Sequence, residues 1–109
     1  MTDRVTADDL RAMISWVASR VGVREGQPPE VTFEEPTVGE MLAAGLHPRA
    51  VRQALSAPWW RQMVEDIRET PQFCAPDESL EDILRYARDV VEETFRKRFE
   101  LPPPGVPGP

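Results

Sequence analysis

The sequence predicts an all-α fold: a single small domain of four to five helices followed by a disordered, proline-rich C-terminal tail. Apolar residues recur at helical spacing in five separate segments. The twelve prolines lie between these segments or in the tail, where proline either starts a helix or stops one. With 109 residues, the chain has the length of one domain. We expect residues 1–100 to form the helical domain and residues 101–109 the flexible tail.

The first helix is predicted over about 7–21. Thr6 is a suitable N-cap, and Asp8 and Asp9 then lie beside the positive end of the helix dipole. Its apolar face consists of Leu10, Met13, Ile14, Val17 and Val21.

A long loop is expected after this helix, over residues 23–36. Gly22 would adopt the left-handed conformation just past the helix end. The fragment 31–33 (VTF) favours a short strand, but the sequence shows no obvious strand to pair with it.

Three shorter helices are predicted in the middle of the chain, over about 38–44, 48–57 and 58–69. The first has the pattern of a capping box, with Thr37 as N-cap and Glu40 three residues later. Gly45 closes this helix, and His47 lies near the N-cap of the next. Pro71 prevents the third from continuing.

The longest helix is predicted over about 80–99, with Ser79 as its N-cap. Its apolar stripe consists of Leu80, Ile83, Leu84, Ala87, Val90, Val91, Phe95 and Phe99. On the outer face, i,i+4 ion pairs are expected for Glu81–Arg85, Arg88–Glu92, Glu92–Arg96 and Glu93–Lys97.

The charge of the chain argues against binding to nucleic acid. Its formal net charge is −6, and no third of the sequence is basic, whereas binding to phosphate backbones needs a basic patch. No apolar run approaches the roughly 18 residues of a membrane span, and the N-terminal residues are acidic. We therefore expect a cytoplasmic protein without a membrane partner.

The residue types that support catalysis or metal binding are scarce. Cys74 is the single cysteine and His47 the single histidine, so neither a disulfide nor a zinc site built on thiolates is expected. The sequence contains no phosphate-binding loop and no metalloprotease or hydrolase motif. We predict no catalytic residue, no metal ligand, no cofactor-binding residue and no cofactor.

The two adjacent tryptophans in APWWRQM (57–63) suggest an interface. Trp60 lies on the apolar stripe of its helix, but Trp59 is rotated away from it, and Trp16 also lies off its own stripe. Either another segment of the chain covers these rings or they contact a partner, since tryptophan is enriched at interfaces. Arg52 and Arg61 are further candidates, on or just after the second helix of a helix-turn-helix-like stretch.

These features favour an accessory subunit, adaptor or regulatory protein that acts through protein–protein interaction and has no catalysis of its own. Its partner would be a larger protein or a second copy of the chain. One alternative is a nucleic-acid-binding regulator that uses the helix at 48–57. A second alternative is a subunit of an enzyme with a shared site, in which a carboxylate or His47 lines a cleft between subunits. The proline-rich tail is either a docking peptide or a frayed end.

Overall fold

The computed structural model describes residues 4–100, in which a mostly helical fold includes a small two-stranded sheet. The prediction of an all-α fold is therefore correct for the helices and wrong for residues 21–33. The predicted tail at 101–109 lies outside the described residues. The elements are α1 (Ala7–Ala18), β1 (Val21–Arg24), β2 (Glu30–Phe33), α2 (Val38–Ala43), α3 (Pro48–Ser56), α4 (Pro58–Arg68), the 3-10 helix η1 (Thr70–Phe73) and α5 (Leu80–Arg98).

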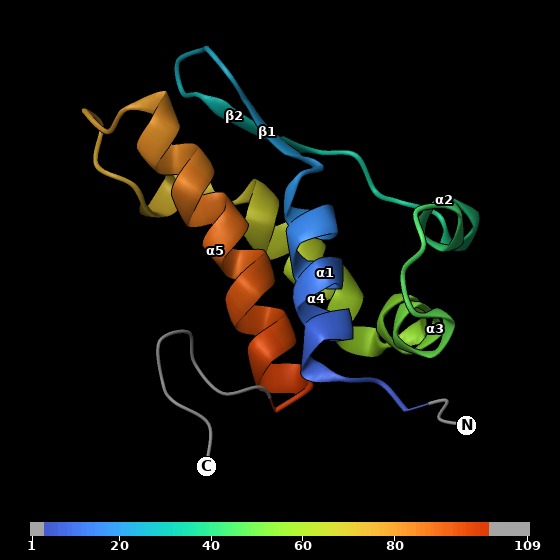
Figure 1. The fold of residues 1–109 in the computed structure, drawn as a ribbon. Helices are drawn as coiled ribbons and strands as arrows, with labels where there is room; N and C mark the ends of the chain where they lie inside the picture. The colour runs from blue at the N-terminus through green and yellow to red at the C-terminus, as the bar shows by residue number, and fades with distance from the viewer. Residues whose placement is uncertain (1–3, 101–109) are drawn as a thin grey trace.

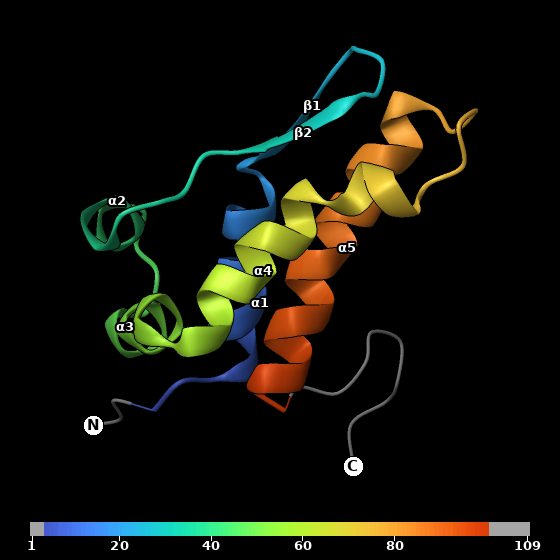
Figure 2. The same ribbon diagram turned by 180° about the vertical axis from the view of Figure 1, so that it is seen from behind.

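Three helices form the centre of the molecule. Helix α5 packs against both α1 and α4, and the hairpin β1–β2 crosses one end of these helices (Figure 1). The short helices α2 and α3 lie on the side of α1 and α4 that is turned away from α5 (Figure 2). The core lies between these elements and includes Met13, Val17, Val64, Ile67 and Phe95, all fully buried.

The segment predicted as a long loop contains the β-hairpin. β1 and β2 pair antiparallel, with Val21 opposite Phe33 and Val23 opposite Val31. Paired residues point to the same face of a sheet, so these four apolar side chains form one face, which packs against α4 and α5. The fragment VTF thus has a partner, formed by residues that we had assigned to the end of the first helix and the start of the loop.

Gly22 has a different role from the one predicted. It lies within β1 opposite Thr32 instead of closing a helix, and α1 ends three residues earlier than expected. A Cβ atom at Gly22 would lie 2.9 Å from Thr32 Oγ1, so the threonine hydroxyl would have to shift to admit a side chain here. Among the described residues, the glycine in the left-handed region is Gly45, with φ +85°, which follows α2 as predicted.

The predicted helix starts are confirmed by their caps. Thr6 and Thr37 each form a complete capping box, with Asp9 and Glu40 respectively. Ser79 Oγ accepts a hydrogen bond from the backbone N–H of Asp82 at 3.1 Å. His47 caps α3, where its Nδ1 accepts a hydrogen bond from the N–H of Arg49.

The outer face of α5 differs from the prediction. Of the four expected i,i+4 ion pairs, the Glu92–Arg96 pair forms, at 2.7 Å. The pairs expected for Glu81–Arg85, Arg88–Glu92 and Glu93–Lys97 are not among the ion pairs of the described residues. Arg85 pairs with Asp82 instead, and Arg88 Nε donates a hydrogen bond to the carbonyl of Ala18 at 3.2 Å, which ties α5 to the end of α1.

Candidate functional site

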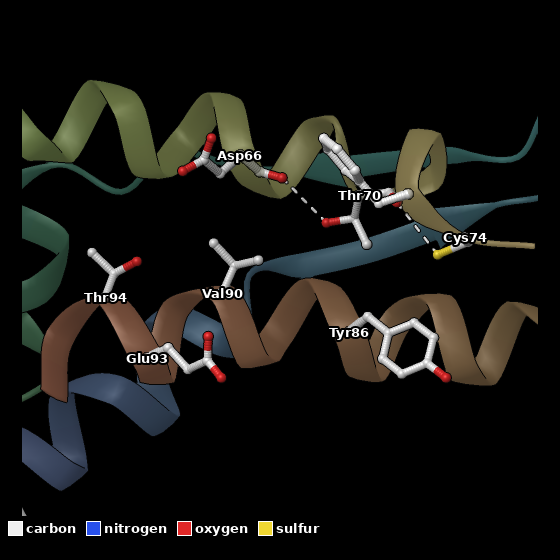
Figure 3. A pocket seen from close by; sticks show the side chains of 8 residues that line it. Asp66, Thr70, Cys74, Tyr86, Val90, Glu93 and Thr94 are labelled. Carbon is white, nitrogen blue, oxygen red and sulfur yellow. Dashed lines mark hydrogen bonds between the residues drawn. The ribbon is translucent and has the colours of Figure 1, made fainter. Parts of the chain in front are cut away.

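An open groove of about 530 Å³ runs along the junction of α4 and η1 with α5. Figure 3 shows its two walls, which run antiparallel. We call it the α4–α5 groove. One wall is formed by Asp66, Thr70, Phe73 and Cys74, and the other by Tyr86, Val90, Glu93 and Thr94.

The spacing of the residues on each wall follows from helix geometry. On α5 the positions Tyr86, Val90 and Thr94 are four residues apart and therefore share a face. This face lies next to the buried stripe of α5, which consists of Ile83, Ala87, Val91 and Phe95. The second face of α5 is thus only partly covered by α4, and it forms the wall of the groove.

One end of the groove is apolar and unusually exposed. The side chain of Phe73 is 83% exposed and that of Tyr86 is 37% exposed. Phe73 is the last residue of η1, which follows α4 after the interruption at Glu69 and contains Pro71 in its first turn. The hydroxyl of Thr70 donates a hydrogen bond to the carbonyl of Asp66 at 3.2 Å, which links η1 back to α4. The short helix therefore places Phe73 at the mouth of the groove while leaving its ring in water.

Cys74 lies on the floor of the same end. Its Sγ donates a hydrogen bond to the carbonyl of Thr70 at 3.3 Å (Figure 3). Burial raises the pKa of the Cys74 thiol, and the nearby charge of Glu78 acts in the same direction. A thiol with a raised pKa is a poor nucleophile at neutral pH. Cys74 is partly buried and packs against the core of the molecule.

The other end of the groove is acidic. Asp66 and Glu93 line opposite walls (Figure 3). Asp66 Oδ1 accepts a hydrogen bond from Gln62 Nε2 at 2.9 Å. Neither carboxylate belongs to an ion pair with any residue in the described part of the chain. These two acids are therefore available to a cation supplied from outside.

A smaller hollow of about 160 Å³ extends the groove toward the end of α5. It shares Asp66 and Thr94 with the groove and reaches Trp59, Lys97 and Arg98. Trp59 is half-buried, and its ring meets those of Phe95 and Phe99 edge to face, at centroid distances of 5.5 and 6.1 Å. The second tryptophan thus packs inside the chain on one side and lines the end of the groove on the other.

The other three residues predicted for an interface lie elsewhere. Trp16 is half-buried on α1, and the guanidinium of Arg20 stacks over its ring at 4.6 Å. Arg52 is exposed on α3. Arg61, on α4, pairs with Glu35 at 3.4 Å. The structure therefore does not bring Trp16, Trp59, Arg52 and Arg61 together, and of these four only Trp59 reaches the α4–α5 groove and its extension.

Sequence reasoning missed the two aromatic residues that define the groove. Phe73 lies between Pro71 and Pro76, and a single apolar residue between prolines has no periodicity that would indicate a role. Tyr86 carried a signal that could have been used, since it lies off the apolar stripe of its helix, as Trp16 and Trp59 do. The position of Tyr86 on its helix shows only that the ring lies off the stripe. That the ring lines a groove depends on η1, which packs against α5 through tertiary contacts.

Two further features of the described residues concern metal sites and membrane-spanning helices. Within residues 4–100, no three or more histidine, cysteine or carboxylate side chains are grouped so that they could hold a metal ion. No helix in the same range is long and apolar enough to cross a membrane.

Comparison with known proteins does not add a family. No protein-family model matches the chain. A search of curated proteins and a search of solved structures likewise give no significant match.

Proposed function

We propose that this protein is a small acidic accessory subunit or adaptor that acts by protein–protein interaction, without catalysis of its own. The α4–α5 groove is the proposed contact surface, and its occupant is a segment of a larger protein. We place the protein in the cytoplasm, the location expected from its sequence.

The observation that carries this proposal is the exposure of Phe73. Three large apolar side chains are classed as exposed in the described part of the chain, namely Val38, Phe73 and Tyr86. Phe73 is by far the most exposed, and two of the three lie together in the groove. Clustered exposed apolar side chains beside a concave surface are typical of interaction sites. Covering a phenylalanine ring contributes about 2 kcal/mol, so a partner that fills the groove gains affinity there.

The nucleic-acid alternative has weaker support. The turn at Gly45 does join α2 to α3 as in a helix-turn-helix unit. However, Arg61 and Arg68 of α4 both lie within 4 Å of Glu35, so part of the positive charge of α4, the helix that follows α3, is neutralised within the chain. The net charge of −6 also opposes association with a phosphate backbone.

The proposal is tested by affinity capture of the tagged full chain from its own host, with nuclease present, in three versions. The wild type is compared with Phe73→Ala and with Val38→Ala, which removes an exposed apolar side chain from α2, outside the groove. We expect a stoichiometric protein that is retained by the wild type and by Val38→Ala and lost from Phe73→Ala. Recovery of nucleic acid, or equal recovery of the partner by all three versions, would contradict the proposal.

A further inference from the structure

The α4–α5 groove changes in chemistry along its length. At one end Phe73 and Tyr86 offer apolar surface, and at the other Asp66 and Glu93 offer two carboxylates from opposite walls. Thr70 and Val90 lie between these ends. A segment that fits the groove must therefore carry an apolar group and a positive charge at a fixed separation.

The carboxylates of Asp66 and Glu93 are the part of the groove that favours a positively charged side chain on the bound segment. The described part of the chain forms eight ion pairs, and Asp66 and Glu93 take part in none of them. Lys97 and Arg98 line the hollow next to Asp66, but neither forms an ion pair with Asp66 or Glu93. A cation at this end of the groove would therefore lie near two carboxylates that have no ion-pair partner among the described residues. The net charge of −6 adds a long-range preference for a basic partner. A second copy of this acidic chain is disfavoured for the same reason.

The walls of the groove favour a helical occupant. Both walls are helices, and their backbone N–H and C=O groups are already engaged within those helices. An extended segment would find no strand edge there to pair with, whereas a helix satisfies its own backbone and presents only side chains. The chain's own proline-rich sequence at 101–109 contains no lysine or arginine, so it does not supply the cation.

The distance between the apolar end and the acidic end of the groove determines how far apart the two contacting residues of a bound helix must be. Tyr86 and Glu93 are seven residues apart on α5, which corresponds to two helical turns and about 10 Å. A helix that lies along α5 therefore reaches both ends with residues seven positions apart on one of its faces.

We propose that the α4–α5 groove binds an amphipathic α-helix of a basic partner, with an apolar side chain against Phe73 and Tyr86 and a lysine or arginine, seven positions away, between Asp66 and Glu93. This inference depends on the proposed function, since it takes the groove as the contact surface. It adds the conformation, the charge and the spacing of the bound segment.

The experiment is selection from a phage-displayed library of random segments of about 16 residues, long enough for about four helical turns, against the full-length chain. We expect enriched sequences that are compatible with a helix and carry an apolar residue and a lysine or arginine seven positions apart. Enrichment of acidic or proline-rich segments would overturn the inference.

A matched pair of double variants then tests the role of the carboxylates. Asp66→Asn with Glu93→Gln removes the two acids of the groove. Glu65→Gln with Asp89→Asn removes two exposed acids from the same helices that do not line the groove, and it changes the net charge equally. We expect the first variant to weaken binding of the best selected segment about tenfold, and the second less than about twofold. Equal losses would show that only net charge matters and would overturn the inference.

Phe73→Ala separates the failure of this inference from the failure of the proposed function. If the selected segments bind Phe73→Ala much more weakly than Val38→Ala but lack the cation, the groove is the contact surface and the inference about its occupant is wrong. If no selected segment depends on Phe73, both are wrong. Far-UV circular dichroism of each variant checks that the fold is retained.

Discussion

The adjacent residues Trp59 and Trp60 show how two neighbouring side chains can have different roles. Successive residues on a helix point about 100° apart, so both rings cannot face the same part of the core. Trp60 is 6% exposed and packs against Phe33 and Phe95, with both ring centroids at 6.4 Å. Trp59 contacts Phe95 and Phe99 and also contacts Trp60 itself, at a centroid distance of 6.4 Å. The rings of Trp59, Trp60 and Phe95 therefore contact one another, and Trp59 connects this aromatic cluster to the hollow at the end of the groove.

Alanine substitutions should separate these two tryptophans. We expect Trp60→Ala to lower the free energy of unfolding by about 3–5 kcal/mol, because it leaves a large cavity in the core. Trp59→Ala should cost less, about 1–3 kcal/mol, because part of its ring is already in water. Urea unfolding of the full chain, followed by circular dichroism, measures both values. Equal losses would mean that Trp59 is as much a core residue as Trp60.

At the scale of single elements, the β-hairpin has little room for a side chain at Gly22. Gly22 faces Thr32, and a Cβ atom at Gly22 would come within 2.9 Å of the threonine hydroxyl. The two residues lie on the face of the hairpin opposite Val21, Val23, Val31 and Phe33. A side chain at Gly22 would therefore strain the pairing without disturbing the core directly.

We expect Gly22→Ala to destabilise the wild-type chain by about 1 kcal/mol. In a Thr32→Ala background the hydroxyl is gone, and the same change should cost much less. The coupling energy from this double-mutant cycle, measured by urea unfolding, should exceed about 0.5 kcal/mol. If the two substitutions change the free energy of unfolding additively, the threonine hydroxyl is not the reason why a side chain at position 22 is unfavourable.

Arg20 connects three elements at the end of α1. Its guanidinium stacks on Trp16, pairs with Glu34 at 3.3 Å after the hairpin, and pairs with Glu40 of α2 at 2.7 Å. The hydrogen bond from Arg20 lowers the pKa of Glu40, and the backbone N–H of Thr37 acts in the same direction. The interactions that orient α2 therefore depend on the charge of Glu40.

This lowered pKa gives a testable dependence on pH. A carboxyl group whose pKa is lower in the folded state stabilises the fold above its unfolded pKa, and this contribution is lost as the pH falls through the folded pKa. We expect Arg20→Gln to raise the pKa of Glu40 toward its ordinary range and to reduce the loss of stability between about pH 5 and pH 3. NMR titration of the Glu40 side-chain carboxyl carbon measures the pKa.

Arg24→Gln is the matched control, because Arg24 pairs with Glu30 beside the loop that connects the two strands, at the other end of the hairpin from Arg20 and Glu34. It should leave the pKa of Glu40 unchanged. A pKa of Glu40 that is the same in the wild type and in Arg20→Gln would show that Arg20 does not set it.

At the scale of the whole molecule, the elements differ in how strongly they are held. Helices α1, α4 and α5 each contribute at least three buried residues to a common core. Helix α2 has six residues, of which only Met41 is buried, and it packs mainly against α3. The packing of α5 against α1 and against α4 therefore stabilises the fold. Helix α2 is held mainly by its capping box, by its ion pair with Arg20 and by the buried side chain of Met41.

Hydrogen exchange should reveal this difference. We expect the amide hydrogens of α2 to exchange through local opening, at a lower free energy than those of Val91 and Phe95 in α5, which should exchange only on global unfolding. Residue-resolved exchange measured by NMR checks this. Equal protection of α2 and α5 would show that the molecule opens as a single unit.

Much of the helical structure could be predicted from the sequence alone. The signals are local: the apolar stripe of α5 repeats every three or four residues, and Thr6, Thr37, His47 and Ser79 cap helices through neighbours two or three positions away. Prolines 48 and 58 start helices for an equally local reason, since they need no hydrogen-bond partner at the first turn. The sequence by itself therefore determined where the helices begin and which faces they bury.

Tertiary structure decided the rest. Val21 and Val23 belong to a strand only because residues 31–33 lie beside them and α4 and α5 cover their apolar face. Phe73 lines the groove because η1 carries it to the edge of α5, and the apolar end of the groove forms where η1 lies beside Tyr86. The position of Asp66 across from Glu93 depends on how α4 and α5 pack. Contacts between residues far apart in the chain leave no periodic signal in one sequence, so the hairpin and the candidate site emerged only from the packing of the elements.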